Sequence, residues 1–236
     1  MAGKLYLLPM LLAESDVDDV IPANVQKRIT SLSLFFAENI KTTRRYLRKL
    51  DKSFDIDGSQ FFVLNKKTGT PELQAMLQMV QNGSDAGIIS EAGLPGIGDP
   101  GSKLIDMAHA NGIRVIPLSG PSSFVLALIA SGLNGQSFAF NGYLPVKTPQ
   151  LITEIKEMES RSARNGQTQI FMETPYRNNQ LMKQLLSSCH PATKLLVAVN
   201  ITAPNERIAT KTIAEWKKTT FDFHKIPAVF ALLKEI

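Results

Sequence analysis

The sequence predicts an α/β protein of two α/β domains, with a parallel sheet in the N-terminal domain and a mixed sheet in the C-terminal domain. Two observations lead to this fold class. In the first half, short apolar runs typical of buried strands alternate regularly with segments of helical apolar spacing. In the second half, the same signals occur in a less regular order. The chain has 236 residues, of which 44% are hydrophobic and 20% charged, enough for buried cores in one large or two small domains.

The first half predicts a doubly wound parallel sheet over residues 1–118. Positions 73, 76, 77 and 80 are apolar and share one helix face, and Gly83 ends that helix. A basic helix is expected after residue 37. The predicted strands are 4–9, 32–37, 60–64, 86–90 and 113–118, and the other predicted helix is 102–110.

The second half, residues 119–236, predicts a sheet with both parallel and antiparallel pairs. A helix is expected after Gly120-Pro121-Ser122-Ser123, and the stretch QSFAFNGYLP at 136–145 predicts a hairpin. Further signals predict helices at 150–160 and 175–188, strands at 168–172 and 195–200, and more sheet in the final stretch KTIAEWKKTTFDFHKIPAVFALL. The domain boundary is placed at residue 118, although no Gly/Ser-rich linker marks it.

The cysteine and histidine content excludes several kinds of site. Cys189 is the single cysteine, which excludes an internal disulfide and a cysteine-based zinc cluster. The three histidines are scattered, so no metal is expected. The N-terminal stretch MAGKLYLLPMLLAESD turns acidic without a small-residue cleavage site, which argues against a signal peptide. The longest apolar run, 124–130, is far shorter than the roughly 20 residues of a membrane span. A cytoplasmic location is expected.

The stretch SEAGLPGIGDPG, residues 90–101 and called the 90s loop below, is predicted to bind a ligand. Within it, Gly96 to Gly101 match the G-x-G-x-x-G spacing of a dinucleotide-binding turn. Five residues separate the preceding strand from Gly96, however, and the next strand ends at Leu118-Ser119 without the carboxylate that would hold a ribose. Glycines let main chain approach a ligand closely, while Pro95 and Pro100 stiffen the loop. A plain tight crossover is the alternative.

Three other strand ends carry similar turns, at 118–122, 171–177 and 199–204. Each combines a polar residue with a proline, a pattern typical of a capped helix start or of an anion-binding turn. Because these turns and the 90s loop are spread over both halves, they predict a cleft between two domains.

The stretch KTTRRYLRK, residues 41–49, predicts a helix with one broad basic face that could follow a phosphate backbone. The formal net charge of +5 permits a polyanionic partner without requiring one. A solvated helix face is the alternative. The candidate RNA-binding residues are Lys41, Arg44, Arg45, Arg48 and Lys49.

Several motifs recur in the order typical of one family. The 90s loop resembles S-D-A-G-T-P-x-I-x-D-P-G, "GIRVIPLSGPSS" (112–123) resembles G-I-R-V-x-P-x-P-G-P, "NGYLP" (141–145) resembles G-F-L-P, and "FMETPYR" (171–177) resembles F-Y-E-S-x-H-R. On these motifs the chain resembles the tetrapyrrole (corrin and porphyrin) methylases, a family of S-adenosylmethionine-dependent methyltransferases. Within that family it is most similar to the branch that methylates a ribose 2′-hydroxyl of small-subunit ribosomal RNA.

The resemblance implies S-adenosylmethionine as cofactor, two α/β domains with the cofactor between them, and a homodimer. It implies that the 90s loop and the 119–123 turn bind the cofactor mainly through main chain, and that three later strand ends contribute. The implied cofactor-binding residues are Pro9, Glu91, Ala92, Gly93, Pro95, Gly96, Ile97, Asp99, Ser119, Gly120, Ser122, Ser123, Met172, Ala198, Asn200, Pro227 and Ala228.

Two segments depart from the branch's pattern. The first loop, P-T-P-I-G-N in the branch, reads PMLLAE at 9–14, and A-E-D-T-R reads AENIK at 37–41. Glu91 also replaces an aspartate. The cofactor is therefore better supported than the RNA substrate, and two alternatives stay open: methylation of a tetrapyrrole or another small molecule, and a non-catalytic protein that binds the cofactor or RNA.

Methyl transfer to a hydroxyl needs alignment of donor and acceptor and is helped by a nearby base. Glu173 and Glu38 are the carboxylates at strand ends, and Arg177 could hold either a substrate phosphate or Glu173. These three are the catalytic candidates, with an ordinary ion pair as the alternative for Glu173.

Overall fold

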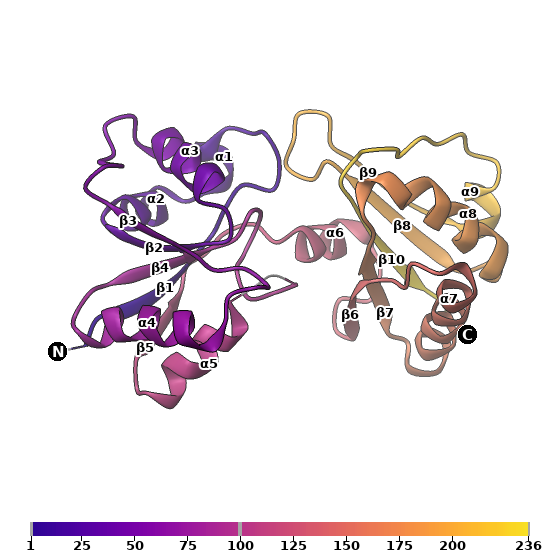
Figure 1. Ribbon diagram of the computed structural model, residues 1–236. Helices are drawn as coiled ribbons and strands as arrows, with labels where there is room; N and C mark the ends of the chain where they lie inside the picture. Colours follow the sequence, from indigo (N-terminus) through magenta and orange to yellow (C-terminus); the bar gives the residue numbers. More distant parts are fainter. Residues whose placement is uncertain (1, 99–100, 236) are drawn as a thin grey trace. The chain divides into compact units, whose positions relative to one another are not determined.

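A computed structural model describes residues 2–98 and 101–235 (Figure 1). The chain divides into two compact units, Met1–Ser122 and Ser123–Ile236, called unit 1 and unit 2 below. No helix among the described residues is long and apolar enough to cross a membrane. The described residues also contain no group of three or more His, Cys, Asp or Glu side chains able to hold a metal ion.

Unit 1 is built on a five-stranded parallel sheet, as the sequence predicts. Its strands pair in the order β3-β2-β4-β1-β5, and every pair is parallel. The strands are β1 (Lys4–Leu8), β2 (Leu34–Ala37), β3 (Gln60–Val63), β4 (Ala86–Ile89) and β5 (Arg114–Pro117). All five lie within or match the predicted runs, because short apolar segments bounded by polar turns are a strong signal for buried parallel strands.

Helices cover both faces of this sheet (Figure 1). The helices α1 (Val17–Val20), α2 (Ala23–Thr30) and α3 (Ile40–Leu50) lie on one face, and α4 (Thr70–Gln81) and α5 (Ser102–Ala110) lie on the other. Alternation along β2 supplies both cores: Phe35 packs with α2 and α3, whereas Phe36 packs with α4 and α5. The basic helix α3 and the helices α4 and α5 confirm predictions, but α1 and α2 were not predicted.

Unit 2 contains a mixed five-stranded sheet, which confirms the fold class. The strand order is β6-β7-β10-β8-β9, with a parallel β6–β7 pair and antiparallel pairs elsewhere. The strands are β6 (Phe138–Tyr143), β7 (Thr168–Met172), β8 (Lys194–Val199), β9 (Arg207–Thr212) and β10 (Ala228–Leu233). The helices are α6 (Ser123–Ser131), α7 (Thr148–Asn165), α8 (Asn178–Ser188) and α9 (Ile213–Trp216), with a short 3₁₀ turn at Pro175–Arg177.

The hairpin predicted at 136–145 is wrong. This segment is the single strand β6, whose pairing with β7 shifts register between Phe140 and Tyr143. Gly142 has φ of 65°, so Asn141-Gly142 forms a bulge within the strand instead of a chain reversal. The same positive φ serves a tight turn and a bulge, and only the partner strand decides between them.

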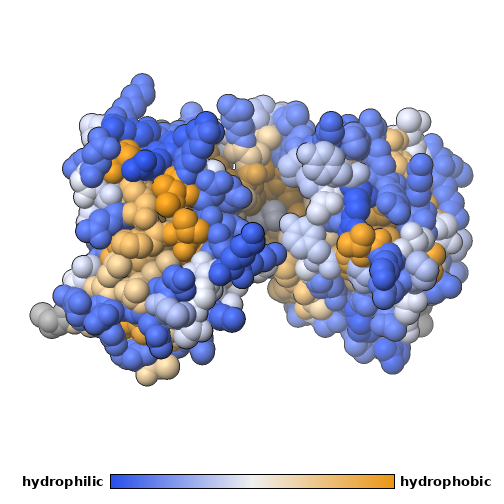
Figure 2. All heavy atoms as spheres, in the orientation of Figure 1, coloured by the Kyte–Doolittle hydropathy of each residue, from blue (hydrophilic) through white to orange (hydrophobic). Residues whose placement is uncertain are grey.

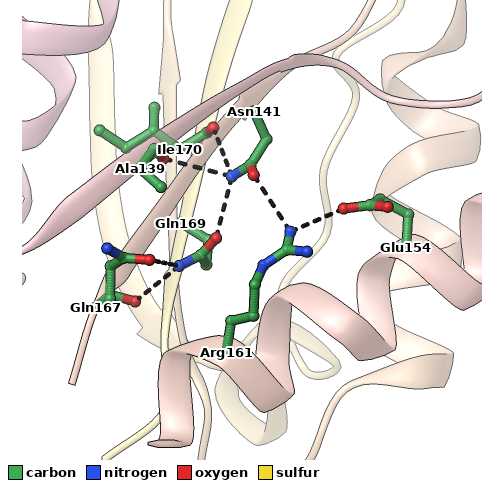
Figure 3. Close-up of polar contacts among 7 residues, drawn as sticks. All are labelled: Ala139, Asn141, Glu154, Arg161, Gln167, Gln169 and Ile170. Carbon is green, nitrogen blue, oxygen red and sulfur yellow. Dashed lines mark hydrogen bonds and ion pairs between the residues drawn. The ribbon is translucent and has the colours of Figure 1, made fainter. Parts of the chain in front are cut away.

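Polar contacts fix this bulge to β7 and α7 (Figure 3). The side-chain amide of Asn141 donates to Gln169 Oε1 at 3.2 Å and to the Ile170 carbonyl at 3.3 Å. Arg161 donates to Asn141 Oδ1 at 3.3 Å and to Glu154 Oε1 at 2.9 Å. The buried side chain of Gln169 is thereby hydrogen-bonded, as a polar group inside a sheet layer must be.

Candidate functional site

The loops after β1, β4 and β5 converge at the carboxyl edge of the unit 1 sheet. These three strands are neighbours, with β1 between the other two. Met10 and Gly93 exchange two main-chain hydrogen bonds, of 2.8 Å from Met10 N to Gly93 O and 3.1 Å from Gly93 N to Met10 O. The 90s loop is therefore tied to the segment that follows β1, at the edge where open α/β sheets bind their ligands.

Gly120 makes the third loop part of the same cluster. A Cβ atom placed on Gly120 would lie 2.0 Å from Cβ of Pro9, a distance that no real side chain tolerates. The main chain at Gly120 thus packs directly against Pro9, and Gly93 adopts φ of 67° beside Leu12. Three of the predicted cofactor residues, Pro9, Gly93 and Gly120, are brought together in one main-chain-lined site.

Tyr46 of α3 holds the Pro9 end of this cluster through a buried hydrogen bond. Its hydroxyl donates to the carbonyl oxygen of Pro9 at 3.0 Å, and the residue is only 3% exposed. Burial raises the pKa of Tyr46 well above its usual value, so the phenol stays a hydrogen-bond donor. Sequence reasoning missed this role, because a tyrosine in an amphipathic helix gives no signal beyond a core position.

Glu38 and Glu91 are hydrogen-bonded to each other where β2 and β4 end. The main-chain N–H of Glu91 donates to Glu38 Oε2 at 3.1 Å. Oε1 of Glu91 accepts from Asn39 Nδ2 at 3.0 Å and from Thr42 Oγ1 at 3.2 Å. Asn39 also caps α3, because its Oδ1 accepts from the main-chain N–H groups of Lys41 and Thr42. The 90s loop and the start of α3 are therefore held together through side chains that replace the aspartates of the resembled branch.

The rest of the 90s loop exposes Ala92, Ile97 and Gly98. Gly96 and Gly98 have φ of 86° and 74°, a region that favours glycine. Pro95 is buried, whereas Ile97 is 44% exposed. Ala92 and Ser119 are also exposed, and Ser122 is half-buried. The predicted residue Asp99 lies outside the described residues.

In unit 2, the other predicted cofactor residues gather at one end of the sheet. Met172 pairs with Val229, and Val229 pairs with Ala198 on the opposite side. Ala228 pairs with Val199, and Asn200 N donates to the Pro227 carbonyl at 3.0 Å. Asn200 has φ of 51°, at a sharp turn after β8. Ser123 is the first residue of α6.

Buried side-chain atoms without a hydrogen-bond partner occur at this same end of unit 2. Among the described residues they are Arg177 Nε, Asn178 Oδ1 and Thr202 Oγ1, which follow β7 and β8. Buried polar atoms in native proteins nearly always have a partner, so three such atoms after two nearby strand ends indicate a missing polar ligand or water. The residues present therefore fit a polar cofactor.

The carboxylate of Glu173 is buried and already has partners within the protein. Its side chain is only 2% exposed, forms an ion pair with Arg177, and accepts from the main-chain N–H of Thr174 at 2.6 Å. Glu38 is half-buried at the end of β2, and its described contact is the one from Glu91. Of the two carboxylates, Glu38 is the more accessible to an acceptor hydroxyl.

All five candidate RNA-binding residues are exposed on α3. Cζ of Arg44 lies 5.1 Å from the ring centroid of Phe61. Arg48 and Lys49 donate to the carbonyls of Lys52 and Ser15, at 2.6 and 2.7 Å. The buried side of the same helix carries Thr43, Tyr46 and Leu47.

Comparison with known proteins identifies the family. The model of the Tetrapyrrole (Corrin/Porphyrin) Methylases matches residues 21–217. The chain is 34% identical over 138 residues to ribosomal RNA small subunit methyltransferase I of Mesorhizobium japonicum, covering 58% of this chain and 46% of that protein. It is 30% identical over 171 residues to the Vibrio cholerae protein of the same name, covering 72% and 58%. The chain thus spans about half the length of these relatives.

Solved structures share the fold. The methyltransferase CobJ is similar with a TM-score of 0.65 at 15% identity, covering 99% of this chain and 95% of that one. Uroporphyrin-III C-methyltransferase from Thermus thermophilus, solved with S-adenosylhomocysteine, gives a TM-score of 0.55 at 15% identity and covers 98% of both chains. Together with the family model, which covers most of the sequence, these findings show that the chain belongs to the tetrapyrrole (corrin/porphyrin) methylases.

Proposed function

We propose that this protein is an S-adenosylmethionine-dependent methyltransferase. The observation that carries the proposal is the cluster of Pro9, Gly93 and Gly120, where three loops from neighbouring strands present main chain at the carboxyl edge of a parallel sheet. Family membership supports it, as does the structural neighbour that was solved with S-adenosylhomocysteine. The strand ends of unit 2, with their unpartnered polar atoms, are the second proposed set of cofactor contacts.

When bound, S-adenosylmethionine supplies a methyl group on a positively charged sulfur. Transfer to a hydroxyl forms a carbon–oxygen bond, breaks the carbon–sulfur bond and releases the hydroxyl proton. Alignment of the two reacting groups is a large part of the rate enhancement that a protein can give such a reaction. Glu38 is the proposed acceptor of the proton, because it lies against the 90s loop and is partly accessible. Glu173 is proposed to hold Arg177 in place.

The proposed acceptor is a ribose 2′-hydroxyl of small-subunit ribosomal RNA. The support is the names of the relatives and the exposed cations of α3. The proposed setting is the cytoplasm, as expected from the single cysteine. The proposed assembly is a homodimer, as the family resemblance implies. The altered first loop, residues 9–14, is proposed to shift which acceptor this chain's site takes.

Two measurements test this function in sequence. Calorimetric titration with S-adenosylmethionine should give saturable binding. Labelled cofactor should then transfer its methyl group to small ribosomal subunits that lack the modification. Binding without transfer to RNA would point to another acceptor, such as a tetrapyrrole, and absence of binding would leave a non-catalytic role.

A further inference from the structure

The α3 basic face is defined as Lys41, Arg44, Arg45, Arg48 and Lys49, all of them exposed. Among the residues that the structure describes, none of these five takes part in an ion pair. Residues 1–122 contain as many Lys and Arg residues as Asp and Glu residues, so this row is a local segregation of charge. The described ion pairs all lie in unit 2.

The arrangement is unfavourable for the helix itself. Lys41 and Arg45, Arg44 and Arg48, and Arg45 and Lys49 are each four residues apart, a spacing at which like charges destabilise a helix. Arg48 and Lys49 sit in the last turn, where the helix dipole favours cations, but Lys41 sits in the first turn, where it does not. The stability of α3 therefore accounts for two of the five charges at most.

Three of the five side chains are already held in place. Arg44 lies over Phe61, and Phe61 stacks on the fully buried Phe35 with centroids 5.3 Å apart. Arg48 and Lys49 are anchored to main-chain carbonyls, and Arg48 also interacts electrostatically with Asp51 without forming an ion pair with it. Pre-positioned cations lose less entropy when they bind an anion.

The surroundings of α3 match a polymer better than a single anion. Lys41 to Lys49 spans about 12 Å along the helix, with one cation or more per turn. Hydrophilic atoms cover the part of unit 1 where α3 and α1 lie, and a hydrophobic band runs beside them (Figure 2). Beside α3, the edge strand β3 exposes Val63 by 44%. Proteins that bind single-stranded nucleic acids combine a positively charged surface with aromatic side chains, and α3 supplies the charged part of that combination.

We propose that the α3 basic face is the docking surface for the RNA substrate and binds its phosphate backbone. This inference rests on the proposed RNA methyltransferase function. It extends that function to a surface that binds the RNA before the methyl group is transferred. The start of α3 is joined to the 90s loop through Glu91, Asn39 and Thr42, so RNA bound there lies on an element connected to the proposed cofactor site.

The test neutralises Lys41 and Arg45, whose side chains make no hydrogen bond, ion pair or ring contact with the part of the chain that the structure describes. The double variant K41Q/R45Q removes two of the three like-charge pairs from α3, so its unfolding midpoint should be equal to or above that of the wild type. The matched control is K4Q/R114Q, because Lys4 and Arg114 are exposed, pair across β1 and β5, and lie at the opposite edge of the same sheet. Both variants lower the net charge by the same amount.

The readouts are affinity for unmodified small-subunit ribosomal RNA over a range of salt concentrations, and affinity for S-adenosylmethionine. K41Q/R45Q should weaken RNA binding roughly tenfold or more at ~0.1 M salt and flatten the slope of log affinity against log salt by about 1.4 for single strands. Cofactor affinity should not change. The control should bind RNA as the wild type does.

Equal RNA affinity and salt slope in K41Q/R45Q and the wild type would overturn the docking surface while leaving the proposed function intact. Unchanged affinity for free RNA with weaker binding to whole subunits would assign α3 to a protein partner and also overturn it. A wild-type protein that binds cofactor but neither binds nor methylates RNA would overturn the proposed acceptor, and the docking surface with it.

Discussion

The hydroxyl of Tyr46 in α3 donates a 3.0 Å hydrogen bond to the carbonyl of Pro9, which packs against Gly120 in the proposed cofactor site. Tyr46 lies on the same helix as the α3 basic face. One helix thus buries a residue that supports the proposed cofactor loops and exposes the cations proposed to bind RNA. The predictions below separate these two roles.

Y46F should destabilise the protein by about 1–2 kcal/mol, because it leaves a buried carbonyl of Pro9 without its donor. Urea unfolding measures the change. The control is Y6F, since the Tyr6 hydroxyl lies 3.5 Å from Asp85 Oδ2 and contributes little. Equal losses of unfolding free energy in Y46F and Y6F would show that the hydrogen bond to Pro9 stabilises the fold no more than the weak Tyr6 contact does.

The same tyrosine predicts a pH dependence at high pH. Its folded pKa is raised above the unfolded value of about 10, so the folded state holds the proton more tightly. The contribution of Tyr46 to the free energy of unfolding is complete below pH ~10 and is lost as the pH rises above that value. The stability difference between the wild type and Y46F should therefore shrink above pH ~10. A constant difference would mean that Tyr46 ionises normally in the folded protein.

G120A should disrupt the proposed cofactor site. The added methyl would meet Cβ of Pro9 at 2.0 Å and Cγ at 2.8 Å, so the two loops must separate. Overpacking of this kind costs about 1–3 kcal/mol, and cofactor affinity should fall with it. G135A is the control, because a Cβ at Gly135 meets nothing within 4 Å. Full cofactor affinity in G120A would remove this loop from the site.

E91A should weaken the junction between the 90s loop and α3. It removes the acceptor of Asn39 Nδ2 and Thr42 Oγ1, and at this exposed position the loss should be about 1 kcal/mol. E91Q keeps one side-chain oxygen and should lose less. The same variants report on coupling: RNA should tighten cofactor binding in the wild type and not in E91A. Identical behaviour of E91A and E91Q would exclude a role for the side-chain oxygen.

E38Q and E173Q should give opposite results. E38Q should lower the methyl-transfer rate by about 10²-fold while cofactor affinity and the unfolding midpoint stay unchanged, because a general base acts on the proton alone. E173Q should leave the rate nearly unchanged and lower stability by about 1–3 kcal/mol, because it breaks a buried ion pair with Arg177. Loss of activity in E173Q with a stable fold would make Glu173 the base instead.

The sequence predicted the strands of unit 1 well because each one reads as a local apolar run. It did not predict β6, where Asn141-Gly142 reads as a turn but forms a bulge paired to a strand some 30 residues later. It also missed α9, although Thr212 and Glu215 carry a readable capping-box signature. The short α1 and α2 gave weaker signals, because their helical identity depends on packing against the sheet.

The candidate site was predictable only in part. Glycine- and proline-rich strand ends marked the loops at Gly93 and Gly120, since such residues restrict or permit main-chain shapes locally. The sequence could not show that Met10 pairs with Gly93 or that Tyr46 supports Pro9, because these contacts join segments far apart in the chain. The sequence left a Glu173–Arg177 ion pair open as one alternative, and the structure contains that pair, but the burial of Glu173 could not be predicted.

The most direct test of the central claim is calorimetric titration of the wild type and G120A with S-adenosylhomocysteine. The proposed site predicts saturable binding at one site per chain in the wild type, and markedly weaker binding in G120A with G135A unaffected. Absence of binding in a folded wild-type protein, or equal binding in the wild type and G120A, would contradict a cofactor site built on Pro9, Gly93 and Gly120.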